Sequence, residues 1–308
     1  MWFRNLIVYR VPARWDMDAA TLERLLAPQA LPEGPGLEET RTGWVAPRDG
    51  GDALVHAVGG QLLVALRQDR KLLPAKVVAQ VLKARVEQIE AQDGFRPGRT
   101  RLKELKEQVR DELLPRAFSL SVDTRAWIDP KHGWLAIDAA STARADELFG
   151  LLAKAIEGFA GRALRVADSV PGAMTAWLAD DAPPSGFTID QDVELRARDG
   201  RATVRYANQS LERDEVARHV KAGKQCTRLA LTWAGRVSFV LTDRLELKRV
   251  RPLDVLKERA GGGGGAGGAE ADAAERFDSD FALMAGELAR LLGDVVDALG
   301  GVQQARAA

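Results

Sequence analysis

Residues 72–119, LLPAKVVAQVLKARVEQIEAQDGFRPGRTRLKELKEQVRDELLPRAFS, decide the fold of this chain, because they read as two helices that meet at a Gly/Pro turn. Apolar residues recur mainly every three or four positions in each arm, which is the period of one helix face. In the first arm they are Val77, Val78, Val81, Leu82, Val86 and Ile89, and in the second Leu102, Leu105, Val109 and Leu113. Two amphipathic helices in succession predict a helical hairpin.

The ends of these two helices are marked by residues that interrupt a helix. Gly94, Pro97 and Gly98 supply the break between the arms, and we expect Thr100 to cap the second helix. Pro115 ends that helix, because proline has no backbone N–H to donate into it.

The charges of the second arm are sorted by face. At 100° per residue, Lys103, Lys106 and Arg110 fall on one flank of the leucine stripe, and the acidic residues cluster nearly opposite the stripe. Residues 62–116 hold 13 Lys/Arg against 8 Asp/Glu, an excess of +5. This excess indicates an acidic partner. A solvated hairpin with ordinary surface charge remains the alternative.

The segments on either side of residues 72–119 favour β-strands with a few helices. Strands are expected at 2–11 and in TGWVAP, and ALVHAVGGQLLVALR predicts a β-hairpin that turns at Gly59 and Gly60. Residues 117–141 predict two more strands around a turn at 129–133. Helices are expected at 19–26 and after Ser141 or Thr142. Because strands and helices do not alternate regularly, we predict an α+β fold with antiparallel sheets rather than a doubly wound nucleotide-binding fold.

A second lobe is predicted from about residue 171. It has a short helix at 174–179, an exposed linker at 182–186, a strand in RATVRYA and a helix around 214–221. Three strands follow, with turns at Ala234-Gly235 and Thr242-Asp243. Residues 196–251 carry 14 Lys/Arg against 6 Asp/Glu, a second basic region with an excess of +8. The predicted domains are therefore a central domain (1–71 and 120–170), a hairpin tip (72–119) and a base (171–308).

The base is expected to end in a flexible linker and a helix. The residues GGGGGAGG at 261–268 cannot hold one backbone conformation without a large loss of conformational entropy. The segment also lacks the Gly-Lys-Ser/Thr that ends a phosphate-binding loop. The helix that follows, ERFDSDFALMAGELARLLGDVVDALGG, is acidic and amphipathic. Its apolar stripe comprises Phe277, Phe281, Met284, Leu288, Leu291, Val295 and Leu299. We favour packing of this stripe within the protomer over a subunit contact.

Composition limits the function classes further. The 308 residues carry 44 Lys/Arg and 44 Asp/Glu, so any nucleic-acid role must rest on a local patch. Cys226 is the only cysteine, which rules out an intrachain disulfide and fits a reducing cytoplasm. Charged residues interrupt the N-terminal apolar run, and no later run has the length of a membrane span. We expect a cytoplasmic protein.

The sequence offers no constellation typical of an enzyme. His56, His132 and His219 are scattered, and neither HExxH nor CxxC occurs. The pairs Asp190/Asp192 and Asp278/Asp280 are expected in turns or at helix starts, where aspartate caps a helix more often than it binds a metal. No serine elbow or activated cysteine is present. We predict no catalytic activity, no metal and no cofactor, and we expect Trp127 and Trp134 in the core.

Segments along the whole chain resemble a known family. They are WFRNLIVYR at 2–10, GWVAP at 43–47, LLPRAFS at 113–119, WID at 127–129, AGK and RLALTW at 222–233, and RFDSDFALMAGELARLL with DALGG at 276–301. The chain is similar in these segments to recombination-associated protein RdgC. The resemblance implies a nucleoid-associated homodimer, closed into a ring at both ends of the protomer. Such a ring encloses duplex DNA without sequence specificity and opposes RecA; single-stranded DNA is a further expected partner.

The resemblance also implies roles for individual residues. Phe118 resembles an aromatic residue at the dimer contact of the tip, and Lys76, Lys224 and Arg96 resemble positions that line the DNA hole. Where a relative has two lysines before a glutamine, this chain has Ala207 and Asn208 before Gln209, so this contact carries less positive charge here. Arg205 and Arg213 are candidates to supply the missing positive charge. Together with the charge pattern, the predicted DNA-contacting residues are Lys76, Arg96, Arg99, Arg101, Lys103, Lys106, Arg110, Arg205, Gln209, Lys221, Lys224 and Arg228.

A function of another class remains open at this point. The acidic C-terminal helix could make the chain a protein-interaction module that acts directly on RecA or other recombination factors. DNA binding through phosphates weakens steeply with salt, whereas an apolar helix contact changes little.

Overall fold

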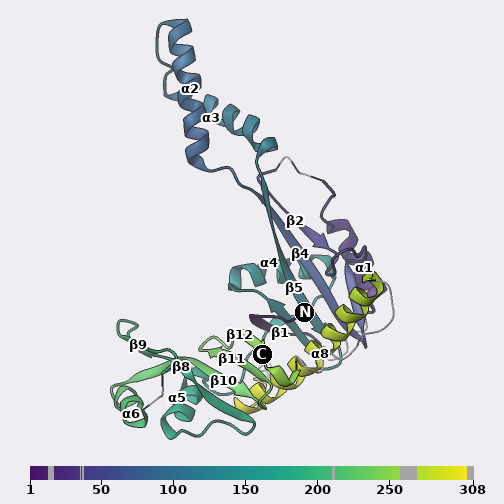
Figure 1. Cartoon of the computed structure of the whole chain (residues 1–308), viewed down its shortest axis with the longest axis vertical. Helices are drawn as coiled ribbons and strands as arrows, with labels where there is room; N and C mark the ends of the chain where they lie inside the picture. The colour runs from purple at the N-terminus through teal and green to yellow at the C-terminus, as the bar shows by residue number, and fades with distance from the viewer. Residues whose placement is uncertain (13–16, 35, 37, 210–211, 257–268, 304–308) are drawn as a thin grey trace.

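The computed structural model describes residues 1–12, 17–34, 36, 38–209, 212–256 and 269–303; the side chains of 213 and 269–272 are also left aside. The chain forms an arc, with a helical hairpin at one end and a group of strands and short helices at the other (Figure 1). The α-helices are α1 (Ala19–Leu26), α2 (Ala75–Asp93), α3 (Arg99–Leu113), α4 (Thr142–Ala155), α5 (Val170–Asp180), α6 (Arg213–Lys221) and α8 (Ala269–Ala298), with 3-10 turns η1 (Ala27–Gln29) and η2 (Leu114–Arg116).

A single 12-stranded sheet runs through both lobes. Its strands are β1 (Leu6–Arg10), β2 (Thr40–Val45), β3 (Val55–Val58), β4 (Gln61–Lys71), β5 (Ser119–Asp129), β6 (Trp134–Asp138), β7 (Arg162–Ala163), β8 (Phe187–Ala197), β9 (Thr203–Tyr206), β10 (Lys224–Trp233), β11 (Val237–Thr242) and β12 (Leu247–Pro252). The order is β2-β4-β5-β6-β1-β12-β11-β10-β8-β9, with β3 on β4 and β7 on β1. All pairings between these strands are antiparallel, which confirms the predicted α+β class with an antiparallel sheet.

Helices cover the two faces of the sheet unequally. One face carries a core that runs through both lobes and includes side chains of α5, α6 and α8. The other face carries a smaller core, formed with α1 and α4, that is confined to the central strands. Trp127 lies in the first core and is fully buried, and Trp134 is buried beside it, as predicted. Over β8–β12 the second face therefore has no core cluster among the described residues.

The predicted helical hairpin is present as α2 and α3, and we refer to it as the hairpin. Gly94 ends α2 in a left-handed conformation with φ 76°, which glycine adopts without a Cβ clash. The N-cap of α3 is Gly98 rather than Thr100, so that prediction was wrong by two residues. Helix α3 ends at Leu113, and Pro115 sits in η2, where a proline in the first turn loses no helical hydrogen bond.

The structure corrects two predictions about aspartates. Asp190 and Asp192 lie inside β8, a strand that we did not predict, and not in a turn or at a helix start. The signal was present, because Phe187, Ile189 and Val193 alternate with polar residues as in a half-buried strand.

Helix α8 begins at Ala269, so Asp278 and Asp280 lie in its interior rather than at its start. Asp280 pairs with the N-terminal amine of Met1. The predicted apolar stripe packs within the protomer: Phe277 is partly buried, and Phe281, Met284, Leu288, Leu291, Val295 and Leu299 are fully or almost fully buried. The Gly-rich segment 261–268 lies outside the described residues. No helix in the described part of the chain is long and apolar enough to cross a bilayer.

Candidate nucleic-acid interface

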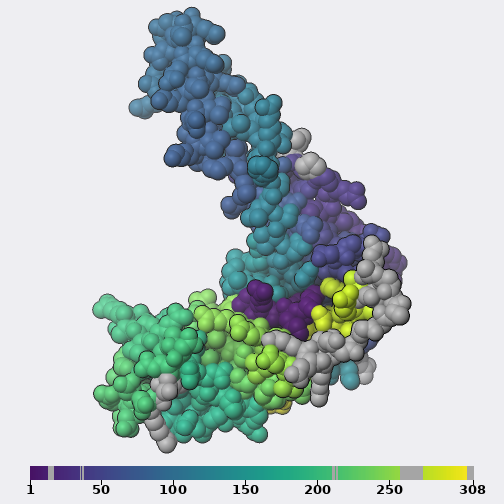
Figure 2. Space-filling model, viewed as in Figure 1, coloured from purple at the N-terminus to yellow at the C-terminus, as the bar shows by residue number. Residues whose placement is uncertain are grey.

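The predicted DNA-contacting residues lie on both arms of the arc. Figure 2 shows that the molecule is hollowed on one side, between the hairpin and the strands of the base. In Figure 1, α5 and α6 lie below β8 and β10, on the outer side of the arc. The face of β8–β12 that these helices leave uncovered, called the base face below, is thus turned toward the hollow.

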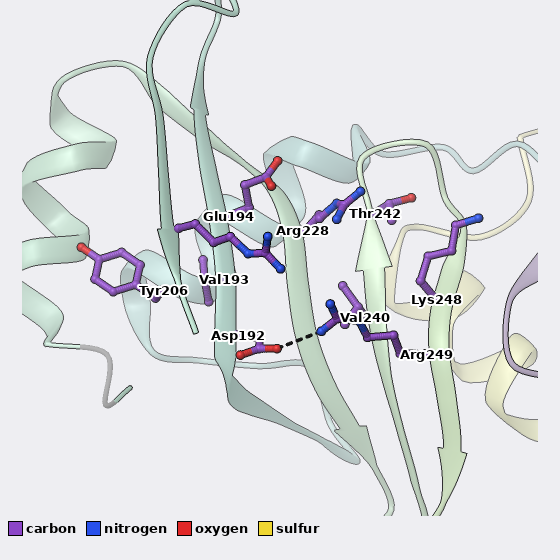
Figure 3. Close-up of a pocket in the computed structure, with 10 residues that line it drawn as sticks. Asp192, Val193, Glu194, Tyr206, Arg228, Val240, Thr242, Lys248 and Arg249 are labelled. Carbon is purple, nitrogen blue, oxygen red and sulfur yellow. Dashed lines mark hydrogen bonds and ion pairs between the residues drawn. The ribbon is translucent and has the colours of Figure 1, made fainter. Parts of the chain in front are cut away.

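Strand register brings two predicted residues together on the base face. Arg205 on β9 and Arg228 on β10 both pair with Glu194, which lies on β8 between them. They line a shallow hollow of about 40 Å³ together with Asp192, Val193, Glu194, Tyr206, Val240, Thr242, Lys248 and Arg249 (Figure 3). Four cations therefore face two carboxylates here.

The carboxylates of the base face form hydrogen bonds and ion pairs with groups other than Arg205 and Arg228. Glu194 Oε1 accepts hydrogen bonds from Arg196 Nη2 at 2.9 Å and from the Thr227 hydroxyl at 2.9 Å. Asp192 Oδ2 lies 3.2 Å from Arg249 Nη1, the contact dashed in Figure 3. Arg205 and Arg228 are exposed and have no ion pair within the described residues. The base face therefore presents uncompensated positive charge.

Sequence reasoning did not single out Lys248 and Arg249 as site residues. Arg249 has φ 53°, beside a register shift in the pairing of β11 with β12. An irregularity of this kind redirects a side chain, and no sequence signal marked it. Lys248 Nζ lies 3.1 Å from Glu246 Oε2 and donates to the Ala140 carbonyl at 3.1 Å, so its charge is partly compensated.

The other predicted residues of the base lie apart from Arg205 and Arg228. Lys224 is half-buried, and its Nζ lies 3.3 Å from Nδ1 of His219 on α6, which places it with the helix-covered face. Lys221 is exposed at the end of α6, and Gln209 is exposed in the loop before it. The backbone N–H of the adjacent Asn208 donates to Asp192 Oδ1 at 3.0 Å, which anchors that loop to β8. The side chain of Arg213 lies outside the described residues.

The hairpin separates its apolar seam from its cations. Val78, Val86, Leu105 and Val109 are buried between α2 and α3. Arg85 spans the two helices and makes two 2.8 Å hydrogen bonds to the Glu112 carboxylate. These hydrogen bonds, and then the opposite charges of the two groups, raise the pKa of Arg85 and lower that of Glu112. The seam is thin, since it has few buried side chains on each helix.

The three cations of the α3 flank are not equivalent. Lys103 and Lys106 are exposed and form no ion pair with a described residue, whereas Arg110 is half-buried and pairs with Glu39 from the loop before β2. Arg101 pairs with Glu104 at 3.0 Å. Lys76, Arg96 and Arg99 are exposed on the hairpin. Local spacing predicted the flank but not the long-range contact with Glu39.

Phe118 is 84% exposed and lies directly after η2, at the junction of the hairpin and β5. Leu120 and Val122 follow at 50% and 40% exposure. Strand β5 pairs with β6 only from Ala126 onward, so residues 119–125 have β4 on one side and no described strand on the other. An unpaired edge with exposed apolar side chains is a ready surface for another chain.

The described residues contain no group of three or more His, Cys, Asp or Glu placed to hold a metal ion. His132 Nδ1 lies 2.6 Å from Asp129 Oδ2, and His56 Nε2 lies 2.9 Å from Asp278 Oδ1. Cys226 is buried, and burial raises the pKa of its thiol to about 12. A thiol with this pKa is a poor nucleophile at neutral pH.

Comparison with known proteins agrees with the resemblance read from the sequence. Residues 1–302 match a family model described as "RdgC: Putative exonuclease, RdgC". The chain is 54% identical over 306 residues to recombination-associated protein RdgC of Cupriavidus pinatubonensis, covering 99% of this chain and 100% of the relative. It is 52% identical over 302 residues to the protein of that name from Bordetella parapertussis (98% and 99% covered) and 53% identical over 305 residues to that of Burkholderia cenocepacia (99% and 97%). The chain therefore belongs to the RdgC family of recombination-associated proteins.

Proposed function

We propose that this chain binds DNA without sequence specificity, as a homodimeric ring that encloses a duplex. The observation that carries the proposal is the presence of unpaired cations on both arms of one arc. Arg205 and Arg228 lie on the base face, and Lys103 and Lys106 lie on the hairpin. Lys and Arg contacts to phosphates give affinity without reading bases. Two arcs facing each other would surround a duplex with such contacts.

We propose that one of the two dimer contacts forms at the junction of the hairpin and β5. The exposed Phe118 and the unpaired edge of residues 119–125 support this position. The other contact is proposed at the base, near the loop that contains Gln209. Sedimentation at micromolar concentration without DNA should give the mass of a dimer, because a monomer would leave this apolar edge in water. A monomer mass would defeat the ring model.

The proposed biological effect is modulation of recombination and replication by opposition to RecA, with the protein associated with the nucleoid. A ring that occupies the duplex blocks access to it without touching RecA. The rival function, a direct contact with RecA through the C-terminal helix, is less well supported. Because the apolar stripe of α8 is used in the core, the exposed side chains described for this helix are largely polar or small and include no large apolar anchor for a helix-in-groove contact.

We further propose that binding occurs without hydrolysis. Asp190 and Asp192 are neighbouring carboxylates on β8, but the Thr232 hydroxyl donates to Asp190 at 2.9 Å and Arg249 pairs with Asp192. Both carboxylates are thus engaged by protein groups. Incubation of labelled linear DNA with the protein and Mg²⁺ or Mn²⁺ should leave the substrate intact. Cleavage lost in D190N/D192N would contradict this proposal.

The experiment that tests DNA binding is an electrophoretic mobility shift with several unrelated duplexes across a salt series. Affinity should be about equal for all sequences. The logarithm of the binding constant should fall linearly with the logarithm of the salt concentration, by about 0.9 per phosphate contact. Affinity that depends on one sequence, or that does not change with salt, would reject the proposal.

A further inference from the structure

One exposed aromatic side chain has no role in the packing described above. Phe95 lies in the turn between α2 and α3, at the far end of the hairpin, and its side chain is 68% exposed. It is absent from both core clusters. With a rise of about 1.5 Å per residue, the 19 residues of α2 place this turn about 28 Å from the start of the helix.

The turn holds Phe95 between constrained positions. Gly94 closes α2 in the left-handed region, and Pro97, which is buried, precedes the extended Gly98. The apolar seam of the hairpin consists of other residues, so Phe95 contributes little to it. An exposed phenylalanine on a constrained turn is a ready contact for a flat apolar surface.

The surroundings of Phe95 are cationic. Residues 93–103 contain four cations, Arg96, Arg99, Arg101 and Lys103, against one carboxylate, Asp93. The first turn of α3 holds no acidic residue. Arg96 and Arg99 are exposed and have no ion pair within the described part of the chain. A flat apolar side chain followed in the sequence by two arginines that have no ion pair among the described residues complements a nucleobase flanked by phosphates, rather than a neutral or basic protein surface.

We propose that Phe95 stacks on an unpaired nucleobase while Arg96 and Arg99 contact the adjoining phosphates. In an intact duplex, both faces of a base are covered by its neighbours, and phenylalanine has no group that can bond to base edges. Its contribution therefore exists only where a base face is free, as in a gap, at an end or in a single strand. The tip of the hairpin gives the protein a preference for DNA with unpaired bases. This inference rests on the proposed DNA binding.

The test compares full-length F95A with the unmodified protein on two labelled DNAs, one an intact duplex and the other the same duplex with a short gap containing 2-aminopurine. F95A should weaken binding to the gapped DNA by about 5- to 150-fold, which is the contribution of one base–aromatic stack to the binding constant. It should change binding to the intact duplex by less than about 2-fold. The 2-aminopurine emission should be quenched by the unmodified protein and by F95W, but not by F95A. V77A removes another exposed apolar side chain of the hairpin and should behave as the unmodified protein.

Several results would overturn the inference while leaving the proposed function intact. Equal weakening on both DNAs would mean that Phe95 supports duplex binding in general. No weakening on gapped DNA would mean that the side chain does not stack. A fall of F95A to monomer mass in sedimentation would make Phe95 a subunit contact. The proposed function itself is tested separately, by the salt series with unrelated duplexes and by the sedimentation mass, and F95A does not decide it.

Discussion

The hairpin and the base face both carry predicted DNA-contacting cations, but they position them by different means. On the hairpin, Lys103 and Lys106 lie where helical spacing puts them, over a seam of few buried side chains. On the base face, Arg205 and Arg228 are brought together because β8 pairs with both of their strands. The hairpin depends on local sequence, and the base face depends on register between distant segments.

This difference has a consequence for mutation. Cations on an exposed helix flank can be reversed without opening a cavity, because they are not part of the seam. Cations on the base face stand beside carboxylates that have other partners, so reversal there would add like charges to a crowded sheet. The first region is best tested by charge reversal and the second by neutral substitution.

The largest effect is expected from the variant K103E/K106E/R110E. Most DNA binding should be lost, about equally for every sequence, because phosphate contacts become repulsive. Each lost contact should reduce the salt slope by about 0.9, and Arg110 should contribute less than the lysines because Glu39 already pairs with it. Mobility shifts across a salt series would measure this. The control variant K131E/K154E changes exposed lysines of the central lobe. If the salt dependence of DNA binding by the triple variant is unchanged, the α3 flank is ordinary solvated surface.

A smaller loss is expected from R205Q/R228Q on the base face. Two phosphate contacts should disappear, so the slope of log binding constant against log salt concentration should become shallower by about 0.9 for each contact. The fold should be kept, because both side chains are exposed. The same mobility shifts measure the loss, with K221Q as a single-contact comparison. If R205Q/R228Q binds as the unmodified protein does, the base face lies off the DNA and the hairpin alone carries binding.

The two regions should also differ in how they unfold. Leu229 and Val109 are both fully buried, on β10 and on α3. L229A should lower the global free energy of unfolding by about 2–5 kcal/mol, because β10 belongs to the main core. V109A should instead lower protection from hydrogen exchange within residues 75–113 and leave the global transition nearly unchanged. Equal global losses in denaturant titrations of the two variants would mean that the hairpin unfolds together with the sheet.

The smallest effect on stability is expected at the junction of the two regions. F118S should reduce the dimer fraction in sedimentation but shift the melting temperature little, because the side chain is 84% exposed in the protomer. L120S provides a comparison two residues along the same edge. A large drop in the melting temperature of F118S with the dimer intact would mean that Phe118 stabilises the protomer and not the subunit contact.

The sequence by itself determined the features that depend on local spacing. Helical periodicity predicted α2, α3 and the buried stripe of α8, and the Gly59-Gly60 pair predicted the turn between β3 and β4. It also marked the exposed Lys103 and Lys106. The alternation in β8 was equally present, but its aspartates were expected in a turn or at a helix start, so that strand was not predicted.

Only the tertiary structure decided which charges are compensated and which side chains share a face. Arg110 meets Glu39 across 71 positions of the chain, and Arg205 and Arg228 come to lie on either side of Glu194 because β8 pairs with both β9 and β10. Helical spacing relates residues three or four positions apart, so the face of a helix on which a residue lies can be read from the sequence. Ion pairing and sheet register depend on which distant segments meet, and that choice is made by the burial of the whole core.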